Sequence, residues 1–146
     1  MRRLTTAAAF LALAVPVGRA DEKDDAAKKL NGTYTTVEVI YDGKPDEKKK
    51  EDVKGFVVKD GTMTMKIRSG EEKGTFKLDP TKKPAHIDIK PEGDRDVVHG
   101  IYQVKETDKG TELTVALAIP GADRPKDFRG EGKDQIVVRL LRKKDK

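Results

Sequence analysis

The chain has 146 residues, of which 39% are charged, 35% hydrophobic and 5% aromatic, and its formal net charge is +5. This composition suits a single soluble domain and argues against a bundle of membrane-spanning helices. The sequence contains no cysteine, which excludes disulfides, thiolate metal ligands and a cysteine nucleophile. These figures limit the class of protein but leave its function open.

The first 20 residues are typical of a secretory signal peptide. Arg2 and Arg3 precede a largely apolar run over residues 4–17, and small residues at positions 18 and 20 suit a cleavage site after Ala20. The apolar run is shorter than the roughly 20 residues that a transmembrane helix needs. We therefore expect a signal peptide over residues 1–20 and one domain over residues 21–146. That domain would be periplasmic or extracellular and not embedded in a membrane.

Cleavage also weakens the case for a nucleic-acid partner. Residues 1–20 hold three arginines and no acid, so the remaining chain has 28 basic and 26 acidic residues and a net charge of +2. Its lysine runs, as at 48–50 and 82–83, have no stripe of interleaved aromatic residues. Such runs are usually solvated faces, and we expect no nucleic-acid binding.

Residues 21–32 predict one short helix, because acids come first, lysines follow, and Asn31-Gly32 is a typical stop. The rest of the chain has no sustained helical period. Instead, eight short segments alternate between apolar and polar residues or are wholly apolar, and each is bounded by turn-forming residues. They are Thr33–Tyr41, Val53–Lys59, Thr62–Arg68, Gly74–Leu78, Ala85–Lys90, Val97–Lys105, Glu112–Ile119 and Gln135–Arg142.

The connections between these segments are mostly short. Asp60-Gly61 predicts a two-residue hairpin turn, because both residue types accept a positive φ. Residues 107–110 and 79–84 resemble longer hairpin connections. Two stretches are irregular: residues 42–52, which could hold a helical turn, and residues 120–134.

Alternation within the segments predicts an antiparallel all-β fold with one apolar and one wet face. Eight consecutive strands can satisfy their edges by closing into a barrel, so we expect a single eight-stranded antiparallel barrel with a short N-terminal helix. A barrel of this size is either filled by its own side chains or holds one small ligand. The pattern does not choose between these outcomes.

Several separated motifs add a resemblance. Leu30-Asn31-Gly32-Thr33-Tyr34, the run Gly74–Pro80, Gly100-Ile101-Tyr102 and Pro120-Gly121 occur in the order found in the small secreted planctomycete-type domain family. The likeness covers residues 28–142. It implies a lipocalin-like barrel, and the family has no established function.

Lipocalins begin their first strand with Gly-x-Trp and carry a basic residue on the last strand that packs over that ring. Gly32-x-Tyr34 and either Arg139 or Arg142 are the nearest equivalents in this sequence. A guanidinium stacked on the tyrosine would close one end of the core. These expected roles are structural.

The favoured function is a secreted, non-enzymatic barrel without a cofactor that binds a small apolar or amphipathic molecule in its interior. The expectation that the barrel binds a ligand rests on analogy with its fold. Residues 97–104 are apolar on both faces, so either Ile101 or Tyr102 could point inward. The candidate ligand contacts are Tyr34, Met63, Met65, Ile67, Phe76, Ile87, Ile89, Leu113, Val115 and Leu117.

The alternative function is a protein-interaction module that acts through the loop 120–128. Its rigid and aromatic residues would present an exposed contact to a protein partner whose identity the sequence does not reveal. The candidate contacts are Pro120, Arg124, Pro125 and Phe128.

Catalytic and metal sites are weakly indicated. Ser69, the single serine of the chain, lies between two predicted strands without a nucleophile-elbow pattern, which favours a turn residue. A zinc site would need His86, Asp88 and His99, but these residues lack close metal-ligand spacing. We therefore predict no catalytic residue and no metal ligand.

Overall fold

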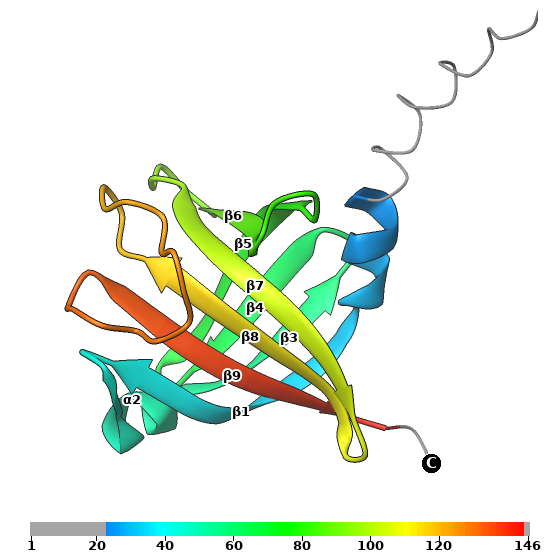
Figure 1. The fold of residues 1–146 in the computed structure, drawn as a ribbon, viewed down its shortest axis with the longest axis horizontal. Helices are drawn as coiled ribbons and strands as arrows, with labels where there is room; N and C mark the ends of the chain where they lie inside the picture. Colours follow the sequence, from blue (N-terminus) through cyan, green and yellow to red (C-terminus); the bar gives the residue numbers. More distant parts are fainter. Residues whose placement is uncertain (1–22, 145–146) are drawn as a thin grey trace, which may run out of the picture.

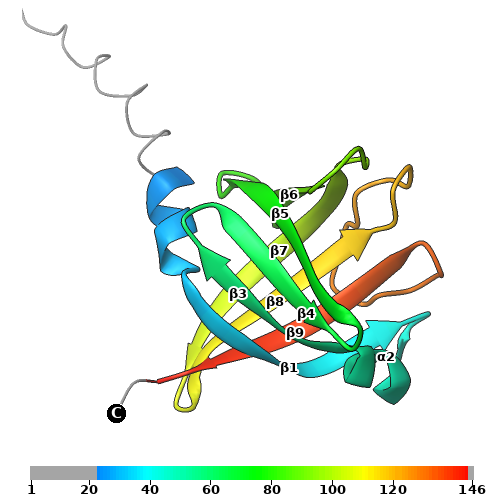
Figure 2. The ribbon, with the colours of Figure 1, turned by 180° about the vertical axis from the view of Figure 1, so that it is seen from behind.

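The computed structural model describes residues 23–144. Figures 1 and 2 show a barrel of long, tilted strands with helical turns at residues 23–29 at one end, here called the N-terminal helical segment. The strands are β1 (Gly32–Tyr41), β2 (Lys44–Pro45), β3 (Val53–Lys59), β4 (Thr62–Ile67), β5 (Gly70–Asp79), β6 (Ala85–Pro91), β7 (Val98–Thr107), β8 (Gly110–Ala118) and β9 (Gln135–Lys143). A short helix, α2 (Glu47–Asp52), lies between β2 and β3.

The sheet is antiparallel and closed. Each long strand pairs with its neighbour in the chain, in the order β1-β3-β4-β5-β6-β7-β8-β9, and β9 pairs back with β1. The two-residue β2 only extends β1 at one edge. The predicted eight-stranded antiparallel barrel is therefore confirmed, and closure leaves the middle of the sheet without an open edge.

The barrel has two different ends. At the helix end lie the N-terminal helical segment and the turns at residues 60–61, 80–84 and 108–109. At the loop end lie α2, the turn at residues 68–69, and the loops 92–97 and 119–134.

Local sequence explains most of the connections. Asp60 and Gly61 have φ values of 46° and 84°, as the predicted two-residue turn requires. The helical turn expected within residues 42–52 is α2, which begins after Asp46, whose carboxylate accepts a hydrogen bond from the Lys49 N–H at 2.9 Å. Ser69 lies in the exposed turn between β4 and β5.

The connection around residues 107–110 was predicted to be longer than it is. Strands β7 and β8 continue to Thr107 and Gly110, so only Asp108 and Lys109 form the turn. The Thr107 hydroxyl explains the difference, because it donates to the Gly110 carbonyl at 2.9 Å and accepts from the Lys109 N–H at 3.3 Å. This side chain stabilises a tight turn that composition alone did not indicate.

The core fills the barrel and extends to one patch of its outer wall. Alternation sends Tyr102 inward, where it joins the main cluster, whereas Ile101 points outward. Ile101, Ala116 and Val137 form a second cluster outside the barrel, against which Phe128 packs. Both residues of the ambiguous Ile101-Tyr102 pair are therefore buried, on opposite faces of β7.

Candidate functional site

Most of the barrel interior is occupied by side chains. Six of the ten predicted ligand contacts are at most 6% exposed and belong to the main core: Met63, which also lines the pocket described below, and the closely packed Tyr34, Phe76, Ile87, Leu113 and Val115. Close packing of this kind leaves no room for a ligand among them. The centre of the interior is therefore structural.

Four predicted contacts, the core residue Met63 among them, line a small pocket at the loop end of the barrel, here called the loop-end pocket. These residues are Met63, Met65, Ile89 and Leu117, and the pocket has a volume of about 120 Å³. The remaining candidate, Ile67, is half-buried at the end of β4 and lies outside this pocket. The structure thus divides the predicted contacts between a packed core, a pocket and the end of a strand.

Strand register explains the composition of the loop-end pocket. Met65 lies opposite Phe56 on β3 and Glu72 on β5, and Ile89 lies opposite Val98 on β7. Residues opposite one another across a sheet share a face, so all of these side chains point to the inside of the barrel. Apolar side chains thus form the walls, and Glu72 lies among the lining residues.

Charged residues surround the opening of the pocket. Arg95, from the loop 92–97, forms an ion pair with Glu72 at 3.7 Å, and both side chains are about half-exposed. The Arg95 Nε donates to the Glu92 carbonyl at 3.1 Å, and the Lys90 ammonium donates to the Arg95 carbonyl. Lys73 also lines the pocket. An apolar cavity with charges of both signs at its edge suits a small amphipathic molecule.

Sequence reasoning missed several lining residues of this pocket. Phe56 could have been found, because the Asp60-Gly61 turn determines the register of β3 against β4 and so places Phe56 opposite Met65. Glu72 and Arg95 gave no comparable signal. A charged residue on the inward face contradicts the alternation, and only the structure shows that the loop 92–97 returns over the pocket.

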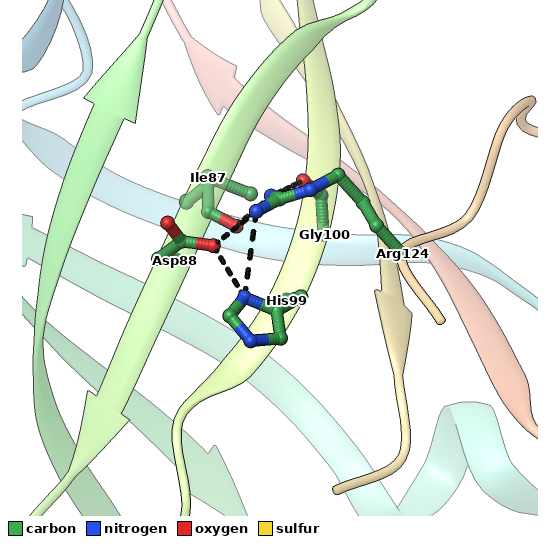
Figure 3. A network of polar contacts seen from close by, with 5 residues as sticks. All are labelled: Ile87, Asp88, His99, Gly100 and Arg124. Carbon is green, nitrogen blue, oxygen red and sulfur yellow. Dashed lines mark hydrogen bonds and ion pairs between the residues drawn. The ribbon is translucent and has the colours of Figure 1, made fainter. Parts of the chain in front are cut away.

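A second polar cluster lies outside the barrel, on β6 and β7 (Figure 3). Asp88 and His99 are paired across these strands, and the Asp88 carboxylate lies 2.8 Å from the His99 Nδ1. One Arg124 nitrogen donates to the same carboxylate oxygen at 2.8 Å, and another donates to the carbonyls of Gly100 at 2.7 Å and Ile87 at 3.3 Å. The cluster ties the loop 119–134 to the barrel wall.

The electrostatics of this cluster favour a charged Asp88. Burial by itself would raise the pKa of Asp88, but hydrogen bonds from His99 and Arg124 outweigh this effect and hold the pKa below its usual value. Burial and the positive charge of Arg124 lower the pKa of His86. Within residues 23–144, no group of three or more His, Cys, Asp or Glu side chains converges as metal ligands would. Asp88 and His99 meet, but their third partner is a guanidinium.

The loop 120–128 lies against the barrel instead of projecting from it. Pro125 is buried, Arg124 makes the contacts described above, and Phe128 packs against Ile101 and its neighbours. Only Pro120 among the four predicted contacts is exposed. The loop therefore does not present the rigid exposed surface that an interaction loop would need. Its side chains instead cover the second apolar cluster.

At the helix end, Arg142 lies over the ring of Tyr34 and forms the predicted contact between a cation and an aromatic ring. Its guanidinium carbon lies 5.6 Å from the centroid of the Tyr34 ring. Burial raises the pKa of Tyr34 although Arg142 opposes the shift. Gly32 is required beside this contact, because a Cβ at its φ of 144° would overlap the Arg142 side chain. Arg139, the other candidate, instead joins Glu38 and Glu112, each at 2.9 Å.

These features define the class of protein as an all-β, lipocalin-like barrel with eight antiparallel strands and a tyrosine-arginine contact at its helix end. Comparison of the chain with protein-family models, with curated proteins and with solved structures found no match. Across the described residues, no helix is long and apolar enough to cross a membrane. The predicted signal peptide lies outside these residues, and the resemblance to the planctomycete-type family stays a prediction.

Proposed function

We propose that this protein is a secreted, non-enzymatic binding protein that takes the apolar end of a small amphipathic molecule into the loop-end pocket. The observation that carries the proposal is the apolar pocket of about 120 Å³ between Met63, Met65, Ile89 and Leu117. A cavity of about 150 Å³ with aliphatic and aromatic walls holds a benzene molecule. The loop-end pocket is therefore suited to a short alkyl chain or a single small ring.

The chemistry of the lining supports the same class of ligand. Methionine side chains are flexible and polarizable, so Met63 and Met65 can adapt to alkyl groups of different shape. The polar head of the ligand would remain at the opening, near Glu72, Lys73 and Arg95. Release to the periplasm or the outside of the cell, after cleavage near Ala20, belongs to the same proposal.

The test uses the methionine methyl groups as reporters. After cleavage at Ala20 the chain keeps two methionines, Met63 and Met65, and both line the pocket. With ¹³C-labelled methionine methyl groups, titration with hexanoate or hexylamine should shift both NMR signals in a saturable manner. The variant Leu117→Trp should abolish the shifts by filling the pocket. Val37→Trp, at an exposed position on β1, is the matched control and should leave them unchanged.

These outcomes distinguish a barrel with a binding pocket from a barrel filled by its own side chains. A folded wild-type protein whose methionine signals do not respond to either probe would overturn it. Shifts that persist unchanged in folded Leu117→Trp would also overturn it, because the probes would then bind elsewhere.

A further inference from the structure

A larger concave surface lies at the opposite end of the barrel. It is a groove of about 1170 Å³ between the N-terminal helical segment and the connection 80–84, and we call it the helix-end groove. Its lining includes Lys28, Lys29, Lys82, Lys83, Tyr102 and Val104. It is separate from the loop-end pocket, with which it shares no lining residue.

The groove runs along a part of β7 that lacks one neighbour. Strand β6 begins at Ala85, opposite Tyr102, whereas β7 continues to Thr107. The residue before Ala85 is Pro84, which has no N–H and cannot extend the ladder as a donor. Residues 103–107 of β7 therefore pair with β8 on one side and with no described strand on the other.

An unpaired strand edge can receive a further strand. Alternate residues of a strand direct their backbone N–H and C=O groups to the same side, so the open side of residues 103–107 presents both donors and acceptors. Beside this edge the groove has an apolar floor. Val104 lies opposite the fully buried Leu113 and so faces inward, yet it is 41% exposed because nothing described covers it.

The walls of the groove are mainly positive. Lys28 and Lys29 line it from the N-terminal helical segment, and Lys82 and Lys83 from the connection 80–84. Arg142 adds a fifth cation, against two lining acids, Asp25 and Glu106. No ion pair within residues 23–144 neutralises any of the four lysines. Charge complementarity therefore favours an acidic occupant.

We propose that the helix-end groove binds an extended acidic peptide segment of a partner protein, which adds as a strand to the free edge of β7. Backbone hydrogen bonds to residues 103–107 hold the peptide, as in other cases of strand addition to a sheet edge. Apolar side chains of the peptide rest on Tyr102 and Val104, and its carboxylates face the lysines. This inference does not depend on the loop-end pocket.

The test probe is an acetylated and amidated hexapeptide of alternating glutamate and valine. On binding, the rate at which backbone amides in residues 103–107 exchange with solvent should fall to about one tenth or less, because hydrogen bonding protects them. The double variant Lys28→Glu and Lys82→Glu should weaken binding by about tenfold or more, because it replaces attraction with repulsion. Lys48→Glu with Lys54→Glu, exposed at other places on the barrel, is the charge-matched control and should bind as wild type does.

Further measurements make the proposal falsifiable. Leu117→Trp, which blocks the loop-end pocket, should bind the peptide normally. Peptide binding without slower exchange in residues 103–107, or equal weakening in both double variants, would overturn the proposal. So would displacement of the peptide by hexadecanoate at equal concentration, because the groove would then be a site for anionic amphiphiles. Absence of binding by the folded wild-type protein would have the same consequence.

Discussion

Through one guanidinium group, Arg142 on β9 contacts the N-terminal helical segment, the residue before β1 and the strand β8. From β9 its guanidinium donates to the Lys29 carbonyl and to the Thr111 hydroxyl, each at 3.0 Å, and to the Asn31 carbonyl. Tyr34, beneath it, donates its hydroxyl to the Leu30 carbonyl at 2.9 Å. Because these bonds start from one planar, charged group, their geometry depends on arginine and not on charge alone.

Replacement of this residue should therefore destabilise the helix end. We expect Arg142→Ala to lower the free energy of unfolding by about 1.5–3 kcal/mol, the range for hydrogen bonds to a charged group. Arg142→Lys should recover little of this loss, and Arg129→Ala, at an exposed arginine, should cost less than about 0.5 kcal/mol. Urea denaturation measures all three variants. A lysine variant as stable as wild type would show that the charge is sufficient.

Asp88 makes stability depend on pH in a defined direction. Its folded-state pKa lies below the usual carboxyl value, because His99 and Arg124 stabilise the carboxylate against the effect of burial. The contribution is therefore fully present above the unfolded pKa, about 3.9, and is lost as the pH falls through the folded pKa. Wild type should thus keep its stability advantage over Asp88→Asn from about pH 6 down to the unfolded pKa and lose it between that value and the folded pKa.

Urea denaturation at several pH values tests this expectation. Arg124→Gln removes one donor and should reduce the same pH dependence in part. Parallel stability curves for wild type and Asp88→Asn across this range would contradict the assignment.

At the scale of elements, the loop 119–134 acts as a cover for one patch of the outer barrel wall. Ile101, Ala116 and Val137 face outward and would be exposed apolar surface without it. Phe128 packs on this patch, and Arg124 fastens the beginning of the loop to β6 and β7. Its length and irregularity therefore follow from a need to bury residues that the closed barrel cannot enclose.

Loss of the aromatic contact should loosen this loop without opening the barrel. Phe128→Ala should lower the free energy of unfolding by about 1–2 kcal/mol, since the ring is only partly buried. Amide hydrogen exchange should become faster in residues 119–134 and remain unchanged in β3 to β5. Equal acceleration throughout the barrel would contradict a role confined to the loop.

At the scale of the whole molecule, the barrel is a solid core with concave surfaces at its two ends. Ile87, Leu113 and Leu140 are fully buried near its centre. Beyond this core the two ends differ, because the helix end carries a large, lysine-lined groove and the loop end a small apolar pocket. A filled centre means that ligands approach from outside and do not pass through the barrel.

The central packing predicts a large cost for truncation. Leu113→Ala should lower the free energy of unfolding by about 2–5 kcal/mol, the usual range for removing a buried leucine side chain. Ile119→Ala, at a position that is 50% exposed, is the control and should cost less than about 1 kcal/mol. Chemical denaturation of both variants gives the comparison. Equal small losses would show that the centre contains unfilled space.

Sequence alone determined the strand content, the strand order and the barrel. Period-two alternation and turn residues are local properties, so the eight strands and the Asp60-Gly61 turn could be predicted within a few residues. The same alternation identified Met63, Met65, Ile89 and Leu117 as inward-facing, and these residues line the loop-end pocket. The resemblance to lipocalins, and not the alternation, indicated Tyr34 with Arg139 or Arg142 as the closing contact of one end.

Tertiary structure decided which parts of the interior are empty and which charges meet. Whether an inward residue lines a cavity depends on the volumes of side chains on several strands, which no local pattern contains. Two of these contacts join residues distant in the chain: Arg95 pairs with Glu72, and Phe128 covers Ile101. The free edge of β7 beyond Tyr102 depends in turn on where β6 begins. Such contacts depend on the path of the loops in space, and for this reason the candidate sites emerged only from the folded barrel.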